Sequence, residues 1–306
     1  MRIGTRGSTL ALAQSGQVRR LLPGGEGAHE LKVIETSGDR SPQASLRRIG
    51  GKGVFSKEIE LELLEGRIDI AVHSLKDLPT EETPGLTLAA LLKREDPRDA
   101  LVARGGLDFA SLSPGAKIGT SSLRRQSQVL ARRPDLAVQD LRGNVPTRIA
   151  KVKEGLLDAV VVAAAGLKRL GLTQEASEIL DEAWMLPAPG QGILALQIRA
   201  DDVRTAEAVR GLDDGASRAE ATAERTLLSG LGGGCLVPVG ARGLARDGRI
   251  VLAGFVGHPS GRPSLRANLE GPMAEASDLG LRLAATLLRA GAKEILAEVR
   301  SDEIFP

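Results

Sequence analysis

A single cysteine, Cys235, directly follows the glycine run Gly232 to Gly234. It is the only cysteine of the 306 residues, so it cannot form a disulfide within the chain and lacks the other thiols of a cysteine-rich metal site. The three glycines free the backbone and let a bulky group approach the thiol closely. By itself, the pattern is more typical of a small, inert core residue at a glycine turn. The rest of the chain must therefore decide whether Cys235 does chemistry.

Polar residues also gather where the apolar run 68–72 ends. That run predicts a strand, and His73, Ser74, Lys76 and Asp77 follow it at once. In open α/β sheets, ligands bind beyond the carboxyl ends of the strands. Asp77 could instead cap backbone N–H groups of a local turn. We favour a carboxylate in a binding site, with neighbouring cations that set its pKa.

Several arginines are expected at the starts of helices, where cations are uncommon: Arg124, Arg125, Arg142 and Arg148. The helix dipole favours cations at the C-terminal end instead. A repeated departure from this preference indicates a functional site. The free backbone N–H groups at the same turns also favour an anion. Arg132 and Arg133, by contrast, fit a solvated surface. The pattern predicts a site for an anionic ligand.

The segment 37–53 is rich in glycine and charge, which is typical of a lid or a binding loop. Its stretch Gly50-Gly51-Lys52-Gly53 is superficially like a phosphate-binding P-loop. However, the spaced upstream glycine and the Ser or Thr after the lysine are both missing. We therefore do not predict nucleotide binding here.

Alternating strands and helices must position these residues. Strands are expected at 2–5, 31–36, 68–72 and 86–92 and, after a charged crossing at 94–99, at 116–119, 138–141 and 159–163. Arg6 and Ser8 lie in the first strand-to-helix turn. A second crossing, 186–192, leads to a strand at 193–198 that is expected to return to the first sheet. The pattern predicts two doubly wound α/β lobes joined by hinges, by analogy with periplasmic binding proteins.

The last third of the chain has a different pattern. It predicts a helix, three antiparallel strands and two further helices, at 217–231, 239–245, 250–256, 264–270, 273–290 and 292–299. This order is typical of a small α+β domain. The expected domains are therefore residues 1–93 with 193–214, residues 98–190, and residues 215–306, which include Cys235.

Composition excludes several other classes of protein. Lys and Arg number 41 and Asp and Glu 39, and aromatic residues make up 2% of the chain, which argues against a nucleic-acid-binding protein. No apolar run approaches the length of a membrane span, so a cytoplasmic protein is expected. The three histidines are far apart and show no metal-ligand spacing, so no metal is predicted.

Many motifs, in order along the whole chain, resemble those of the porphobilinogen deaminase family. They include Thr5-Arg6-Gly7-Ser8, Gly50-Gly51-Lys52-Gly53, His73-Ser74-Leu75-Lys76-Asp77, Arg94-Glu95-Asp96-Pro97-Arg98-Asp99, Gly119-Thr120-Ser121-Ser122-Leu123-Arg124-Arg125, Leu141-Arg142-Gly143-Asn144, Pro189-Gly190-Gln191-Gly192 and Gly233-Gly234-Cys235. Each motif alone is weak, but the combination is very specific. Arg48 and Gly232 depart from the family's usual residues without removing a functional group.

The resemblance implies an enzyme of tetrapyrrole synthesis with three domains. Such an enzyme carries a dipyrromethane cofactor, bound as a thioether to the cysteine that matches Cys235. It adds four porphobilinogen molecules to this primer, each with loss of ammonia, and releases hydroxymethylbilane. Asp77 matches the catalytic carboxylate, which would stabilise the developing cation and move protons. The carboxylates of the pyrroles would explain the arginines.

The resemblance also places further residues. Expected cofactor contacts are Lys52, Ser74, Lys76, Thr120, Ser122, Arg124, Arg125 and Cys235. Expected substrate contacts are Arg6, Ser8, Arg142, Arg148, Arg169 and Gln191. We expect a monomer that acts on a small molecule, without nucleic acid or membrane partners. The alternative is a two-lobed anion-binding protein without enzymatic activity, which would leave the glycine-flanked cysteine unexplained.

Overall fold

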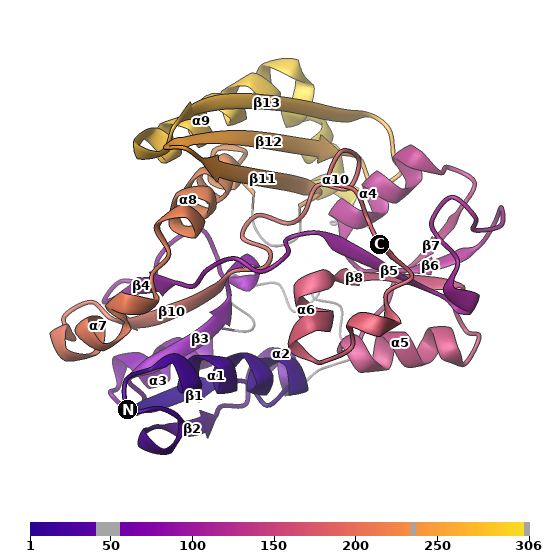
Figure 1. Ribbon diagram of the computed structural model, residues 1–306. Helices are drawn as coiled ribbons and strands as arrows, with labels where there is room; N and C mark the ends of the chain where they lie inside the picture. The colour runs from indigo at the N-terminus through magenta and orange to yellow at the C-terminus, as the bar shows by residue number, and fades with distance from the viewer. Residues whose placement is uncertain (41–55, 234–236, 303–306) are drawn as a thin grey trace. The chain divides into compact units, whose positions relative to one another are not determined.

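The computed structural model describes residues 1–40, 56–233 and 237–302. The chain divides into two compact units, which we describe separately (Figure 1). Unit 1 comprises residues 1–95 and 192–218, and unit 2 comprises residues 96–191 and 219–306. Within the described residues, no helix is long and apolar enough to cross a membrane. The finer division into three domains stays a prediction.

Unit 1 is built on one five-stranded mixed sheet. Its strands lie in the order β2 (Glu30–Val33), β1 (Arg2–Thr5), β3 (Ile70–Ser74), β10 (Leu194–Arg199) and β4 (Leu86–Leu91). Strand β1 is parallel to both β2 and β3, whereas β10 is antiparallel to β3 and β4. The strand expected at 193–198 therefore does return to the first sheet, as predicted.

Helices cover both faces of this sheet because side chains alternate along each strand. Ile70 and Val72 of β3 pack in one apolar cluster with Val18 of helix α1 (Thr9–Leu21). Ala71, which points the other way, packs in a second cluster with Ile59 of α3 (Lys57–Leu64). Short helices α2 (Ser37–Arg40) and α7 (Val203–Val209) complete the described α-helices of this unit, apart from the start of α8.

The chain enters β10 through a close backbone approach at Gly192. This residue has φ +91°, and a Cβ atom there would lie 2.4 Å from the carbonyl oxygen of Glu95. Only glycine combines this left-handed conformation with so little space. The two crossings of the chain, 94–99 and 186–192, thus meet at a position where a side chain does not fit.

Unit 2 contains a second five-stranded mixed sheet. Its order is β7 (Ala137–Gln139), β6 (Lys117–Gly119), β8 (Ala159–Ala163), β5 (Asp99–Ala103) and β9 (Glu178–Ile179). Strand β6 is parallel to β7 and β8, and β5 is antiparallel to β8 and β9. Helix α4 (Leu123–Arg132) packs on one face, and α5 (Val145–Lys153) and α6 (Ala164–Arg169) pack on the other. Strands β5 and β9 are additions to the predicted pattern.

The remaining part of unit 2 is the expected antiparallel sheet with helices. Strands β11 (Val239–Arg246), β12 (Arg249–Gly257) and β13 (Ser264–Pro272) form a meander. Leu252 of β12 lies in one apolar cluster with Leu227 of α8 (Gly215–Gly230), Leu283 of α9 (Ala276–Leu287) and Leu296 of α10 (Lys293–Asp302) (Figure 1). The predicted fold class, α/β lobes with a small α+β domain, is confirmed.

Candidate functional site

The first group of predicted residues lies at one edge of the sheet in unit 1. Strands β1 and β3 are parallel neighbours, so the turns after their carboxyl ends are close in space. Ser8 caps helix α1 by accepting a hydrogen bond from the Ala11 backbone N–H, at 3.3 Å. Gln14 of the same helix donates to the Ser74 hydroxyl at 2.9 Å. This edge thus brings together five predicted site residues: Arg6, Ser8, Ser74, Lys76 and Asp77.

Asp77 ends a short 3₁₀ turn that is anchored by its apolar neighbours. The turn spans Leu75–Asp77, and Leu75 and Leu78 are both buried. The Leu75 N–H also donates to the Ile193 carbonyl oxygen at 3.0 Å. Asp77 itself is exposed. The turn therefore holds an exposed carboxylate at a fixed place.

His73 lies beside this turn but is buried, with 7% of its surface exposed. Burial lowers the pKa of His73 to about 4; Gln197 opposes the shift and the charge of Arg6 adds to it. The imidazole is therefore neutral at neutral pH and is not a cationic ligand for an anion there. Glu60, one of the acidic residues of the neighbouring helix α3, accepts a hydrogen bond from Gln197 at 3.0 Å.

This buried histidine predicts a pH dependence of stability. Its pKa is lower in the folded chain than the ordinary value of about 6.5, so the unfolded chain binds more protons between these values. The contribution of neutral His73 to the free energy of unfolding is fully present above pH 6.5 and is lost as the pH falls to about 4. A shift of one pKa unit corresponds to 1.36 kcal/mol, so the free energy of unfolding should fall by about 3 kcal/mol over this range.

Urea unfolding of wild type and of His73→Gln at several pH values tests this contribution. We expect the wild type to lose more stability than the variant between pH 6.5 and pH 4, since other groups titrate equally in both. Parallel curves for the two proteins would contradict the assignment.

The second group of predicted residues lies in unit 2, around a buried carboxylate. Asp99, the first residue of β5, is fully buried between Arg124 and Arg125. Its Oδ2 accepts from Arg124 Nη1 at 2.7 Å, and its Oδ1 accepts from Arg125 Nη2 at 2.7 Å and Nε at 3.2 Å. The amide of Gln191 also donates to Oδ1, at 2.9 Å. Three predicted site residues thus converge on one acid that the sequence analysis did not select.

The cluster carries two positive charges and one negative charge away from water. Burial opposes ionisation of Asp99, but the charges and hydrogen bonds of Arg124 and Arg125 outweigh it and hold the pKa of Asp99 well below its ordinary range. Both guanidinium groups are almost wholly buried, with 3% and 6% of each residue exposed. The net charge of the cluster favours an additional anion.

The start of helix α4 presents further polar groups at this place. Ser122 is its N-cap and accepts from the Arg125 backbone N–H at 3.4 Å. The Thr120 hydroxyl accepts from the Ser122 backbone N–H at 3.2 Å, and Thr120 is buried. These two predicted residues therefore shape the turn between β6 and α4, and the N–H groups of that turn add to the positive potential.

The remaining predicted arginines follow neighbouring strands of the same sheet. Arg142 comes after β7, with its Nε 3.9 Å from a carboxylate oxygen of Asp140. Arg148, on α5, donates from Nε to the Gly143 carbonyl oxygen at 2.8 Å. Arg169 is the last residue of α6, which follows β8. Since β6, β7 and β8 are parallel, the turns after all three lie at one edge of the sheet.

Two predicted cofactor contacts, Lys52 and Cys235, lie outside the described residues. The chain just before Cys235 is described, and it explains part of the glycine run. Gly232 has φ +65°, and its N–H and that of Gly233 donate to the carbonyl oxygens of Ser229 and Leu228. This is the glycine-type end of a helix, here α8. Gly232 therefore stops the helix three residues before the thiol.

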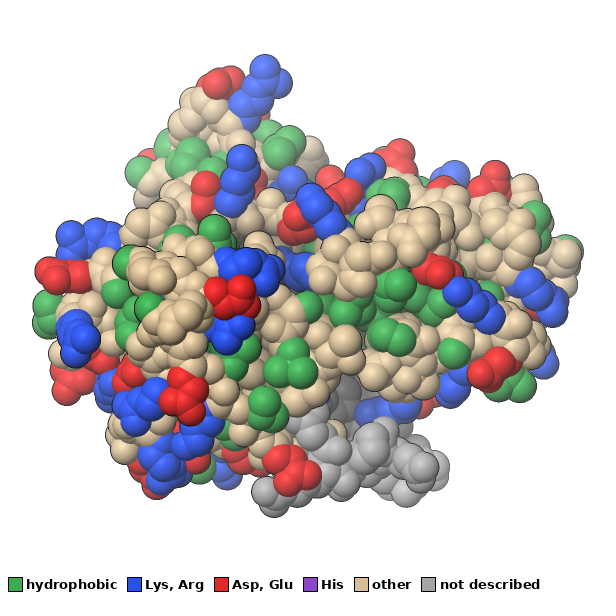
Figure 2. Space-filling view, turned by 60° about the horizontal axis from the view of Figure 1, so that its bottom comes forward, with side chains coloured by type: hydrophobic (Ala, Val, Ile, Leu, Met, Phe, Trp, Pro, Cys, Tyr) green, Lys and Arg blue, Asp and Glu red, His purple; other side chains and the backbone are tan. Residues whose placement is uncertain are grey.

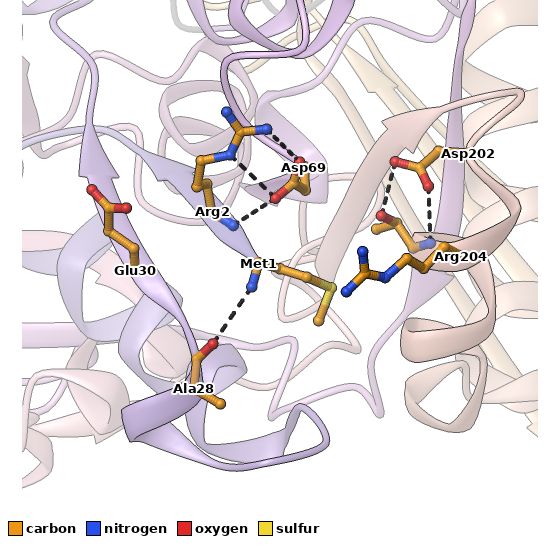
Figure 3. A pocket seen from close by; sticks show the side chains of 8 residues that line it. Met1, Arg2, Ala28, Glu30, Asp69, Asp202 and Arg204 are labelled. Carbon is orange, nitrogen blue, oxygen red and sulfur yellow. Dashed lines mark hydrogen bonds and ion pairs between the residues drawn. The ribbon is translucent and has the colours of Figure 1, made fainter.

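A separate cavity of about 510 Å³ lies in unit 1 and is lined by polar residues (Figure 3). Arg2 and Asp69, which form an ion pair at 2.7 Å, belong to its wall. Arg2 begins β1 and Asp69 immediately precedes β3, so this cavity is at the amino ends of the parallel strands. The predicted residues Arg6 and Asp77 follow the opposite ends, so the cavity is not their binding site.

Charged side chains of both signs lie on the surface. On the face shown in Figure 2, basic and acidic side chains are interspersed, as the near-zero net charge leads one to expect. Among the residues that the structure describes, no group of three His, Cys, Asp or Glu side chains is placed to hold a metal ion.

Family models match nearly the whole chain. The model "Porphobilinogen deaminase, dipyromethane cofactor binding domain" matches residues 1–207, and "Porphobilinogen deaminase, C-terminal domain" matches residues 218–289. The chain belongs to the porphobilinogen deaminase family. This confirms the predicted family, the predicted enzyme class of a tetrapyrrole-forming transferase, and a dipyrromethane cofactor; the thioether to Cys235 stays a prediction.

Individual relatives agree over their full lengths. The porphobilinogen deaminase of Desulforudis audaxviator is 49% identical, covering 98% of this chain and 97% of the relative. That of Deinococcus radiodurans is 47% identical, covering 97% and 98%. Among solved structures, the methionine-binding protein MetQ is 10% identical with a TM-score of 0.44, covering 69% of this chain and 89% of its own. Nothing in these comparisons favours the non-enzymatic alternative.

Proposed function

We propose that this chain joins four porphobilinogen molecules, each with loss of ammonia, and releases the linear tetrapyrrole hydroxymethylbilane. The bound dipyrromethane supplies the primer to which the substrate units are attached. The observation that carries the proposal is the buried, net-positive cluster of Asp99, Arg124 and Arg125 at the start of α4. Its chemistry fits a ligand with several carboxylates, because guanidinium groups bind carboxylates through two parallel N–H bonds.

The hydrogen bonds of Arg124 leave two donors that fit a carboxylate of the cofactor. Arg124 uses only Nη1 for its bonds to Asp99, Met185 and Leu186. Its Nε and Nη2 groups receive no acceptor from the described part of the chain. They form the side-on edge of the guanidinium, which suits a carboxylate of the primer. Ser122, Thr120, Ser74 and Lys76 are proposed as further contacts, together with Lys52 and Cys235.

Asp77 is proposed as the catalytic carboxylate. Loss of ammonia leaves positive charge on the substrate, and an ionised carboxylate stabilises that charge as it develops. The same group can accept and return a proton during departure of the amine. The anchored turn of Leu75–Asp77 supplies the fixed position that this role requires.

The substrate side is proposed to consist of Arg6, Ser8, Arg142, Arg148, Arg169 and Gln191. Porphobilinogen carries an acetate and a propionate group, which need cationic partners. Arg142 is half-buried at the strand-to-helix turn after β7, and its ion pair with Asp140 is long, at 3.9 Å. Its guanidinium is therefore available to a substrate carboxylate at little cost.

Replacing Arg142 by Ala should lower kcat/KM for porphobilinogen about 10- to 100-fold, because the variant loses hydrogen bonds to a charged group. The free energy of unfolding should change by less than about 0.5 kcal/mol, as for a surface substitution. Steady-state kinetics and urea unfolding measure the two effects. Arg132→Ala, an exposed arginine at the end of α4, is the matched control. An equal effect on kcat/KM in both variants, or a change in stability alone, would remove Arg142 from the site.

The reaction itself has a direct test. Purified protein supplied with porphobilinogen should release four ammonia molecules for each linear tetrapyrrole formed, because every unit loses its amine. A ratio near one, or consumption of porphobilinogen without a tetrapyrrole product, would contradict the proposed polymerisation.

We also propose a cytoplasmic monomer of three domains, with boundaries at residues 1–93 with 193–214, 98–190 and 215–306. A mass near that of one chain in light scattering tests the monomer.

A further inference from the structure

Asp99 touches two arginines and a glutamine of the proposed site, yet it is fully buried and has no assigned role. We propose that Asp99 is a positioning residue, which fixes the edge of the Arg124 guanidinium that receives a carboxylate of the primer. This inference rests on the proposed function, because it concerns the ligand of that same site.

The two oxygens of Asp99 accept hydrogen bonds from different parts of the two guanidinium groups. Oδ1 accepts from Arg125 Nε and Nη2, so it takes the side-on edge of that guanidinium. Oδ2 accepts from Arg124 Nη1 alone, at 2.7 Å. Arg125 is thus held along the edge that best suits a carboxylate, whereas Arg124 is held at its far corner.

Backbone carbonyl groups complete the same arrangement. The Leu186 oxygen accepts from Arg124 Nη1 at 2.5 Å, and the Val161 oxygen accepts from Arg125 Nη1 at 2.9 Å. Every described acceptor of Arg124 therefore binds at the Nη1 group of its guanidinium. The Nε and Nη2 groups are left as a pair of parallel donors for an external carboxylate.

The charge of Asp99 is needed to keep two neighbouring cations in this position. Without it, two buried guanidinium groups on adjacent residues would repel each other in a place with little water. They would turn toward solvent or toward other acceptors, and the open edge of Arg124 would lose its direction. An uncharged amide at this position can no longer accept at both oxygens or balance the charge.

Gln191 links the same carboxylate to the second crossing of the chain. Its amide nitrogen donates to Asp99 Oδ1 at 2.9 Å and to the Pro97 oxygen at 2.7 Å. Gln128 of α4 similarly donates to the Leu186 oxygen at 3.0 Å and accepts from the Leu186 N–H at 2.9 Å. Asp99 therefore sits where β5, α4 and the crossing segment are tied together, which fixes its own position.

The test is the Asp99→Asn variant, which keeps the shape of the side chain and removes its charge. Intact-mass spectrometry measures the fraction of folded, purified protein that carries the covalent dipyrromethane. We expect that fraction to fall about tenfold relative to wild type, the effect of losing one charge-assisted hydrogen bond to the primer. Porphobilinogen KM and kcat are then measured for the remaining loaded enzyme.

The matched control is Glu220→Gln. Glu220 is also a buried acid of unit 2, and it accepts from Arg242 at 3.1 Å and from the Ala245 N–H at 3.0 Å. Its loss should lower the melting temperature but leave the loaded fraction of the folded protein at the wild-type value. A purely structural role of Asp99 would give this same result.

A second variant keeps the proposal testable if Asp99→Asn does not fold. Arg124→Lys retains the cation but replaces the side-on edge by a single ammonium group. It should also reduce the loaded fraction about tenfold. Full loading of either folded variant would overturn the positioning role while leaving the proposed function intact. Wild-type protein without the adduct would overturn the proposed function, and this inference with it.

Discussion

Replacing Asp77 by Asn is expected to lower kcat by about 10² to 10³, the cost of removing one electrostatic stabiliser of a transition state. The side chain is exposed, and the buried Leu75 and Leu78 anchor the turn. The substitution should therefore leave the melting temperature close to that of the wild type. Since the proposed substrate contacts bind the carboxylates of porphobilinogen, KM should change much less than kcat.

The control for Asp77 is Glu82→Gln, an exposed acid five residues further along the same loop. It alters the net charge of the chain equally but should leave kcat unchanged. Asp77→Glu, which keeps the charge and displaces it by one methylene, should retain more activity than Asp77→Asn. If kcat of Asp77→Asn stayed within a few-fold of wild type, the carboxylate would not be the catalytic group.

Replacing Cys235 by Ala is expected to abolish covalent loading and, with it, turnover. A thioether needs the sulfur, and this chain has no second cysteine to take its place. The helix before it is ended by Gly232 and packed through the buried Leu231. The folded structure should thus survive the substitution, and circular dichroism with mass spectrometry of the same sample checks both points.

Cys235→Ser is a useful companion to that variant. It retains a polar group of similar size but replaces the soft sulfur nucleophile by a much weaker hydroxyl. Loading should be lost in this variant too. An adduct that persists in either variant would place the covalent bond on another residue, and loss of the fold in both would return Cys235 to a role in the core.

Much of the fold was predictable because its signals are local. Polar residues directly follow the strand ends at Thr5 and Gly119 and also gather around Ser74, and both the apolar runs and the turns are visible in the sequence. Ser122 caps α4 in the structure, and a serine just before a helix is the usual sequence signal for such a cap. The return of the strand at 193–198 to the first sheet followed from the order of the two α/β patterns.

Asp99 was missed because its partners are distant in sequence. In the run 94–99 it is one of several charges, and those charges suggest an exposed crossing. In the structure it opens β5, a strand buried throughout, and meets Arg124 and Arg125 some 25 residues later. The arginines themselves were expected to face a ligand, whereas much of their hydrogen bonding is internal. Only tertiary structure reveals which donors remain.

Gly232 shows a different limit of the sequence. Its run of glycines suggested space for a bulky group beside the thiol, but its left-handed backbone serves to end α8. A glycine just after a long amphipathic segment is a known signal for a helix end. The end of the helix therefore explains the first glycine of the run without reference to the cysteine.

We propose that this chain carries its primer on Cys235, and intact-mass spectrometry of the purified wild-type protein is the most direct test. The expected mass exceeds that of the bare sequence by one dipyrromethane, located by peptide mapping on the fragment that contains Cys235. A wild-type mass equal to that of the sequence alone, in protein that is folded, would contradict it.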